Sequence, residues 1–270
     1  MAINFSRVLT LIEKDWAELR KSKYVLYSLV GLPLLLAILM PLSTVAPFTY
    51  ITPDQQNDSL PYVNSIKPPI SMWDTLTELQ KTIVIMAYFS HIFFLIIPAM
   101  IPSVIAADSI AGEKARKSFE AILATPLTNT EILIGKIGLP FILGIAGTVI
   151  GAIPYCIILY YLTVNVLPFN ILLDINFILL IVLLTPASGL LTAVSMVFVS
   201  SRVSNTRDAQ QLGAFIVLPL ILFFIIQVIL IIFSTITIII GAAILFMIDI
   251  VLLKFSINVF NRENIMTKFT

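Results

Sequence analysis

The residues best suited to chemistry gather in one stretch, AADSIAGEKARKSFEAILATPLTNTEILIGKIGLP, which holds four basic and four acidic side chains within residues 106–140. We expect these carboxylates to lie on a solvated surface beside cations. A general acid needs a buried, apolar setting that raises the pKa of its carboxyl group, and this segment does not offer one. The only histidine is His91, which excludes a credible Ser-His-Asp set, and no GxxxxGK[ST] phosphate loop occurs. Cys156 is the only cysteine, which leaves thiol chemistry and a zinc site without ligands. We therefore predict no catalytic residue and no metal site.

The composition indicates a membrane protein. Of the 270 residues, 59% are hydrophobic and 11% are charged, and the mean hydropathy is +1.04, far from the average of soluble domains. A helix needs about 20 apolar residues to cross roughly 30 Å of hydrocarbon. The sequence predicts an all-α integral membrane protein in which residues 1–270 form one transmembrane domain with six spans. We place the spans at 24–48, 82–107, 137–163, 175–200, 212–233 and 236–256.

The positive charges indicate the orientation. Fourteen of the sixteen Lys and Arg residues lie before the first span, after the second and fourth spans, or at the C-terminal end from Lys254 onward, and the other two, Lys67 and Lys81, follow the first span. Because cytoplasmic loops are enriched in Lys and Arg, we expect both termini in the cytoplasm, together with the segment 108–136 and the tail 254–270. The expected location is the plasma membrane. A net charge of +1 gives no indication of a nucleic acid partner.

Residues 1–23 carry an amphipathic pattern before the first span. Apolar residues recur at helical spacing from Phe5 to Leu19, and basic residues take the other face. Such a helix is expected in the inner membrane interface, anchored by Trp16 and by cations that contact anionic lipid. A soluble helix docked on a partner is the alternative. A cleaved signal peptide fits poorly, because its apolar core would be only about 7 to 15 residues long.

One sizeable outer segment, 49–81, follows the first span. Its first half is rich in proline and polar residues, and the apolar residues from Trp73 to Leu79 predict a short helix on the membrane face. Roughly thirty residues bury little core of their own, so we expect a cap.

In the third span, Gly147 and Gly151 have the small-xxx-small spacing that permits close packing within the chain or between two copies.

The charged segment predicts two helices separated by a break. Across 111–123, apolar and charged residues take opposite faces, as is typical of an amphipathic helix outside the hydrocarbon, and Glu113 would pair with Lys117. Pro126 disfavours helical geometry at the preceding residue, and TNTE (128–131) is a capping box that starts a new helix. The segment is either a solvated connector or a docking surface for a cytoplasmic partner.

The run AGEKARKSFEAILATPLTNTEILIGK resembles the first cytoplasmic loop of permeases of the ABC type 2 exporter superfamily, where GEKERxxxExLLxTPLSxxEIxxGK is typical. More narrowly, it resembles the Nat-type sodium-exporter permeases. EKDWAELRKSKY, followed by an apolar run with Pro33, is similar to the elbow region of the group, and SNTRDAQQLGAFIVLP (204–219) is similar to the loop and the start of span five. Nat-type permeases often carry a larger outer domain than 49–81, so the resemblance does not assign sodium as the substrate.

The resemblance implies a type V ABC exporter fold, in which a six-span permease, usually a homodimer in membrane lipid, pairs with two separately encoded ATP-binding cassette subunits. Those subunits would bind ATP and Mg²⁺, and this chain would hold no cofactor. The loop between spans two and three would carry the coupling helix that docks on the ATPase, and ATP-driven closure would push it. The matching contact residues would be Glu113, Lys114, Arg116, Lys117, Glu120, Thr125, Pro126 and Glu131.

Three polar residues within predicted spans, His91, Gln227 and Asp249, could face a transport path. Alternatively, His91 could hydrogen-bond a neighbouring helix, and Asp249 could pair with Lys254 about one turn later.

Two other function classes remain open. An ion-coupled secondary transporter often shows internal repeats and polar residues at mid-membrane, and an intramembrane enzyme would have only His91 and Asp249 available. The sequence does not choose among sodium, lipid, drug and peptide as the substrate.

Overall fold

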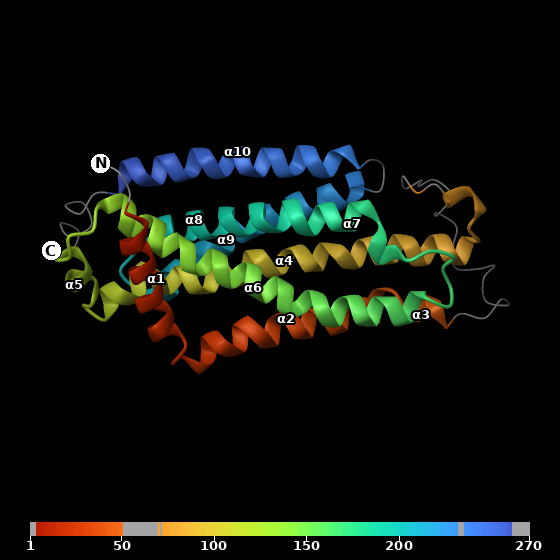
Figure 1. Cartoon of the computed structure of the whole chain (residues 1–270), viewed down its shortest axis with the longest axis horizontal. Helices are drawn as coiled ribbons and strands as arrows, with labels where there is room; N and C mark the ends of the chain where they lie inside the picture. The colour runs from red at the N-terminus through yellow and green to blue at the C-terminus, as the bar shows by residue number, and fades with distance from the viewer. Residues whose placement is uncertain (1–3, 51–69, 71, 232–234, 261–270) are drawn as a thin grey trace.

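The computed structural model describes residues 4–50, 70, 72–231 and 235–260. Every regular element in these ranges is a helix, and the long helices run side by side along one axis (Figure 1). The long helices are α2 (Lys23–Thr44), α4 (Glu78–Ala115), α6 (Asn129–Thr163), α8 (Thr185–Arg202), α9 (Thr206–Ile231) and α10 (Ile236–Val259). The shorter ones are α1 (Phe5–Leu19), α3 (Ala46–Thr49), η3 (Trp73–Thr75), α5 (Phe119–Leu123), η4 (Ile171–Leu173), α7 (Ile175–Leu179) and η5 (Leu180–Leu184).

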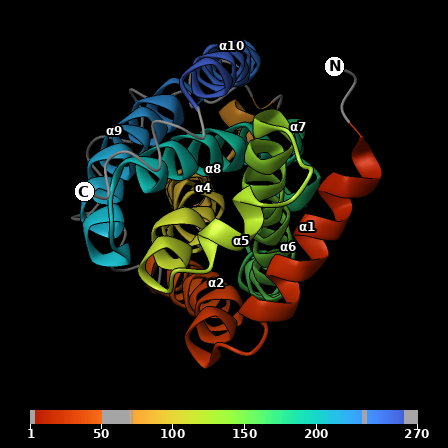
Figure 2. The same cartoon turned by 90° about the vertical axis from the view of Figure 1, so that its left-hand side faces the viewer.

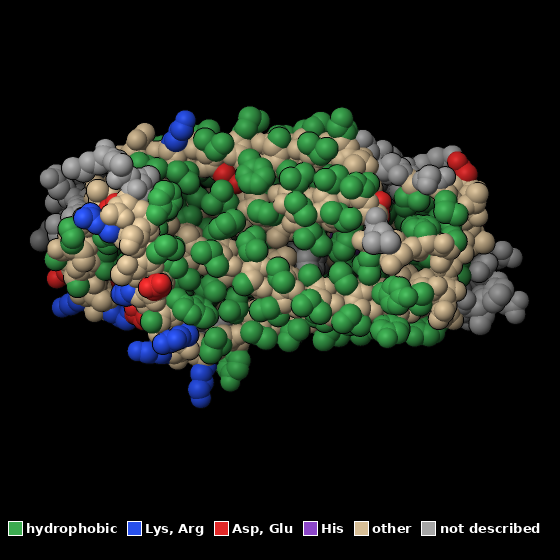
Figure 3. Space-filling view, in the orientation of Figure 1, with side chains coloured by type: hydrophobic (Ala, Val, Ile, Leu, Met, Phe, Trp, Pro, Cys, Tyr) green, Lys and Arg blue, Asp and Glu red, His purple; other side chains and the backbone are tan. Residues whose placement is uncertain are grey.

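Five helical stretches are long and apolar enough to cross a membrane. They are Leu26–Thr49, Glu78–Ala115, Asn129–Thr163, Ile175–Arg202 and Ile236–Val259. The predicted span 212–233 falls on α9, a helix of 26 residues. The last two residues of the predicted span, 232 and 233, and several side chains of α9 lie outside the described part. In Figure 3, hydrophobic side chains cover the body of the molecule, and Lys and Arg gather at one end.

Helix α4 lies at the centre of the bundle, where it packs against α2, α6, α8 and α9 (Figure 2). Its first turn is fixed by a capping box between Thr77 and Gln80, and it continues without interruption to Ala115. At about 1.5 Å per residue its 38 residues cover about 57 Å, well beyond the hydrocarbon thickness. The expected span 82–107 is therefore only the middle of a longer helix.

Helix α1 crosses one end of the bundle and packs against α6 (Figure 1). The amphipathic helix is confirmed, but its buried face differs from the predicted one: Val8, Leu11 and Asp15 are buried, whereas Phe5 is 73% exposed. Leu11 lies against Gly135 of α6, where a Cβ atom would approach its side chain to 2.7 Å. A side chain at that position would therefore push α1 away from the bundle.

The expected membrane-face helix between Trp73 and Leu79 is wrong. Trp73 begins the single 3-10 turn η3, and Leu79 belongs to α4, because Thr77 caps α4 and ends the earlier turn. Trp73 and Leu76 are buried in the core and do not lie on the membrane face. Most of the predicted cap, 51–69, lies outside the described residues.

The predicted span 175–200 contains a π turn. Helix α7 continues into η5, whose widened turn leads directly into α8. Pro186 lies in the first turn of α8, has no N–H to donate and crowds the carbonyl group four residues earlier. A π turn relieves that conflict while the helical path continues.

The glycines of α6 pack inside the chain, in agreement with the intramolecular alternative. A Cβ atom at Gly147 would lie 2.2 Å from the Ile101 side chain, and one at Gly151 would lie 3.2 Å from Pro33. At Gly144 the nearest atom is Pro102 Cγ at 2.5 Å, which belongs to a rigid ring that cannot rotate away. Helices α2, α4 and α6 therefore approach one another through these glycines.

We predict that Gly144→Ala destabilises the protein by about 1–3 kcal/mol, because α4 and α6 must separate to admit the methyl group. Gly31→Ala is the matched control: nothing lies within 4 Å of the added Cβ atom. Thermal unfolding of the purified protein in detergent measures both. Equal midpoints for the two variants would contradict the described contact between α4 and α6.

Candidate functional site

An ion-pair network joins three helices at the end of the bundle that α1 crosses. Its members are Lys14, Asp15 and Glu18 of α1, Asp108 and Glu113 of α4, Arg116 at the C-cap of α4, and Lys136 of α6. These residues are far apart in the sequence, so their meeting depends on how α1 packs across α4 and α6.

The centre of the network is buried. The Lys136 side chain is 1% exposed, and its Nζ lies 2.8 Å from Asp15 Oδ2 and 2.6 Å from Glu113 Oε2. Lys14 Nζ donates to Glu113 Oε1 at 2.5 Å. Desolvation opposes the charge of Lys14, but the hydrogen bond and charge of Glu113 outweigh it and raise the pKa of this ammonium above its usual value. Lys14 is therefore cationic across the physiological range, and two lysines neutralise the two buried carboxylates.

The rim of the network is half-exposed. Arg116 lies 3.2 Å from Asp108 and 3.4 Å from Glu18, and Thr206 of α9 donates to Asp108 at 3.0 Å. Ion pairs at this exposure contribute about 0–1 kcal/mol each, so the rim stabilises the fold less than the buried centre does.

Helix α4 ends in a tight backbone motif, and the predicted continuous helix over 111–123 is therefore wrong. The N–H of Ser118 donates to the carbonyl of Glu113 at 3.0 Å, and that of Lys117 donates to Lys114 at 2.9 Å. This is a Schellman motif with Lys117 at φ 57°, the position that usually holds glycine. Because the helix breaks there, the expected pair between Glu113 and Lys117 does not form, and Glu113 pairs with Lys14 and Lys136 instead.

The capping box at the start of α6 is confirmed. Thr128 Oγ1 accepts from the Glu131 N–H at 3.2 Å, and Glu131 Oε2 accepts from the Thr128 N–H at 2.8 Å. The second carboxylate oxygen accepts from the Asn4 N–H at 2.9 Å, and Arg7 donates to the Pro126 carbonyl at 3.1 Å. The loop between α4 and α6 is therefore attached to the start of α1.

A groove of about 520 Å³ lies between α1 and this loop. Arg7, Thr10 and Leu11 line one side, and α5 and the residues after it line the other. We call it the elbow groove. In α5 the side chains of Phe119 and Ile122 are buried, which fixes the short helix against the bundle. The groove is thus a surface built by two separate parts of the chain.

The eight residues expected to contact a partner fall into two groups. Glu113 and Glu131 are buried and engaged as described, and Lys114 donates to the Ser201 carbonyl at 2.6 Å, near the C-terminus of α8. The others lie on or near the surface: Arg116, Lys117, Glu120 and Pro126 are exposed, and Thr125 is half-buried.

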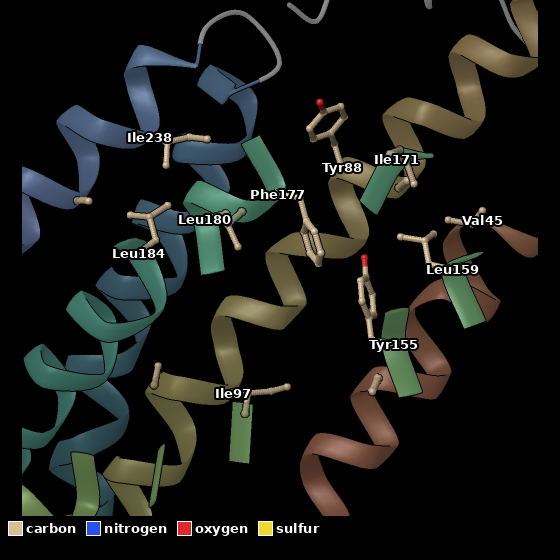
Figure 4. Packing of buried hydrophobic residues seen from close by; sticks show 14 of the residues in the cluster. Val45, Tyr88, Ile97, Tyr155, Leu159, Ile171, Phe177, Leu180, Leu184 and Ile238 are labelled. Carbon is tan, nitrogen blue, oxygen red and sulfur yellow. The ribbon is translucent and has the colours of Figure 1, made fainter. Parts of the chain in front are cut away.

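A buried polar cluster surrounds His91 in the other half of the bundle. The ring lies 4.4 Å from that of Phe177 and 5.6 Å from that of Tyr155, and Figure 4 shows both of these residues near Tyr88. His91 Nδ1 donates to the Ala87 carbonyl, and Nε2 has no hydrogen bond among the described residues. The bond therefore stays within α4, and the expected hydrogen bond to a neighbouring helix is not observed in the described ranges.

Asp249 of α10 is buried, and neither carboxylate oxygen has a hydrogen-bond partner in the described ranges. The suggested local pair does not form, since Lys254 is exposed and makes no ion pair with it in the described structure. Gln227 lies in α9, but its side chain is outside the described residues. The described residues contain no group of three His, Cys, Asp or Glu side chains arranged for a metal ion.

Sequence reasoning missed the α1 half of the network. Asp15 follows Val8 and Leu11 by seven and four residues, so it lies on the same helical face as these buried residues. An acid on the apolar face of a helix was the available signal for a buried partner. Nothing local identified that partner as Lys136.

We predict that Lys136→Met destabilises the protein by about 3–5 kcal/mol, because Asp15 and Glu113 lose a shared cation while both remain buried. Lys21→Met, which removes an exposed lysine just after α1, is the control and should change stability little. Thermal unfolding in detergent compares the two. A Lys136→Met protein as stable as the control would show that the buried pairs do not hold α1 in place.

A comparison with known families matches most of the chain. The family described as ABC-2 family transporter protein matches residues 9–265, which is nearly the whole chain and includes most of α1, the loop between α4 and α6, and α10. The match does not single out the Nat-type permeases. A comparison with the curated proteins finds no match. The chain is a multi-pass membrane protein, and it belongs to the ABC-2 family of transporter proteins.

Proposed function

We propose that this chain is the permease subunit of an ATP-binding cassette exporter and couples ATP hydrolysis by a separate subunit to substrate export. The observation that carries the proposal is the family match over residues 9–265. The elbow groove and the loop attached to α1 support it, because they offer a partner a surface that is connected to three helices of the bundle.

In the proposed assembly, two copies of this chain form a homodimer in the plasma membrane and two cassette subunits bind ATP and Mg²⁺. Helix α9 is the fifth of six spans, α1 is the elbow helix, and the loop with α5 carries the coupling helix. Both termini are cytoplasmic. The gathering of Lys and Arg at the end that carries α1 and α5 supports this orientation (Figure 3).

We infer a narrower docking surface than the sequence motif suggested. Glu113, Lys114 and Glu131 already have partners within the chain, so a second protein would have to break those contacts. Arg116, Lys117, Glu120, Thr125 and Pro126, together with the elbow groove, remain for the cassette subunit. Both signs of charge occur on this surface, which favours a partner surface of mixed charge.

Movement would pass from this surface into the bundle by two routes. The loop continues directly into α6 through the capping box, and it holds the start of α1 through Arg7 and Glu131. The buried pairs of Lys136 then join α1 to α4 and α6. A displacement of the loop would therefore shift α1, α4 and α6 together. His91, Asp249 and Gln227 are the candidates to face the transport path.

Charge reversal on the docking surface tests the proposal. The double variant Lys117→Glu with Glu120→Lys should weaken binding of the cognate cassette subunit by at least about tenfold and abolish the stimulation of its ATP turnover. Ala121 is an exposed residue of α5 that lines the elbow groove. Ala121→Trp should fill the groove and weaken binding of the cassette subunit without a change of charge. Co-purification and ATPase assays in lipid vesicles measure both effects.

Lys254→Glu, on the exposed face of α10, is the control and should bind the cassette subunit normally. Normal assembly and ATP turnover in the loop variants would overturn the docking surface. Transport by this chain without ATP or any cassette subunit would instead favour an ion-coupled secondary transporter.

A further inference from the structure

A second cavity, of about 300 Å³, lies beside the ion-pair network and between α1, α4, α6 and α9. We call it the inner cavity. Its volume is at the lower end of the range for small-molecule sites. Glu18 lines both this cavity and the elbow groove, but the other walls differ, because the inner cavity extends toward Thr206 and Gln210 of α9.

The charges around the inner cavity do not balance. Within the described network four carboxylates meet three cations, so one negative charge is left over. The surplus lies on the more exposed side, where Glu18 and Asp108 share the guanidinium of Arg116 and the second cation near Glu18, Lys14 at 3.5 Å, also pairs with Asp15 and Glu113. Thr206 donates a hydrogen bond to the Asp108 carboxylate. The carboxylate also packs directly on Gly112, where an added Cβ atom would come within 1.9 Å of it.

Two buried carboxylate oxygens that line the cavity accept no hydrogen bond of suitable geometry from the described residues: Glu113 Oε2, 2.6 Å from Lys136 Nζ, and Asp15 Oδ1. Asp15 is 7% exposed, and the ammonium of Lys14, 3.2 Å from its Oδ1, is shared with Glu18 and Glu113. Buried acceptors of this kind are usually satisfied by a donor. Together with the surplus charge, these oxygens favour a ligand that is cationic and donates hydrogen bonds.

The rest of the wall is apolar. Ile105, Leu139 and Pro140 are buried side chains that line the cavity below the carboxylates. A ligand that fills the space must therefore combine a charged head with a hydrocarbon part. The lining contains no aromatic ring that could hold a quaternary ammonium by cation–π contact, so a primary ammonium with three N–H donors fits better.

We propose that the inner cavity binds an amphipathic primary amine, with its ammonium group between Asp108 and Glu18 and its hydrocarbon against Ile105, Leu139 and Pro140. An anionic ligand is excluded on charge grounds, because Lys136 and Arg116 already contact two carboxylates each. Two sources have this chemistry, a free alkylamine and the ethanolamine headgroup of a phospholipid. The inference does not depend on ATP coupling, because the site lies wholly within one chain.

Native mass spectrometry of the full chain in detergent, without any cassette subunit, tests the site. Decylamine should bind with one saturable copy per chain, whereas decanol, decyl sulfate and decyltrimethylammonium should bind at least about tenfold more weakly, since each lacks the cationic N–H donors. Competition by phosphatidylethanolamine but not phosphatidylcholine assigns the lipid source, and absence of competition assigns a free amine. Equal binding of decylamine and decanol would overturn the proposal.

Two carboxylate variants locate the binding. Asp108→Asn and Glu18→Gln each leave the rim neutral and should weaken decylamine binding about tenfold, the effect of losing one charge-assisted hydrogen bond. Glu18 is half-exposed, so its variant should fold even if that of Asp108 does not. Glu13→Gln removes an exposed carboxylate from α1 outside the cavity and should bind normally.

A cavity-filling variant tests the position of the binding site independently of its charge. Ser109→Leu adds a side chain inside the inner cavity without changing any charge and should also weaken decylamine binding. If the carboxylate variants lost binding while Ser109→Leu kept it, the amine would bind elsewhere and the proposed site would be wrong. Loss of amine binding in Glu13→Gln to the same extent would likewise overturn it.

Discussion

The burial of Lys136 between Asp15 and Glu113 is the constraint on which the rest of the α1 end depends. A charge that leaves water needs compensation by close partners, and here those partners come from two other helices. Such a pair adds little net stability compared with an apolar core, but it is costly to separate. Its effect is therefore on geometry: α1 can rest against α6 only where all three side chains meet, and sliding by one turn would leave buried charges unpaired.

Both hollows follow from that placement. The elbow groove lies between α1 and the loop before α6, and the inner cavity lies between α1 and the helices beneath it. Neither would exist if α1 were free in solution. The same helix thus separates the elbow groove from the inner cavity, and Glu18 borders both. Whatever displaces α1 changes the two spaces at once.

Features set by residues close together in the sequence could be predicted, whereas contacts between residues far apart in the sequence could not. The capping box of Thr128 and Glu131 needs only four consecutive residues, and the long apolar runs give helices by composition alone. The break after Ala115 was missed because Lys117 adopts a backbone conformation that no lysine signals. The partners of Glu113 were missed because Lys14 is 99 residues away and only the packing of α1 brings it close. Burial of a charged residue is a property of the whole bundle.

Helix α4 is continuous, but it carries two prolines near its middle. Pro98 and Pro102 lie inside it, and glycines from two neighbours face them: Gly144 of α6 lies against Pro102, and a Cβ atom at Gly189 of α8 would lie 3.4 Å from the Pro98 carbonyl oxygen. The prolines remove backbone hydrogen bonds, and the glycines offer no side chains to interlock with them. The middle of α4 therefore combines missing backbone hydrogen bonds with close glycine contacts. A bend of α4 at this point would change the angle between its two halves without separating interlocked side chains of α6 and α8.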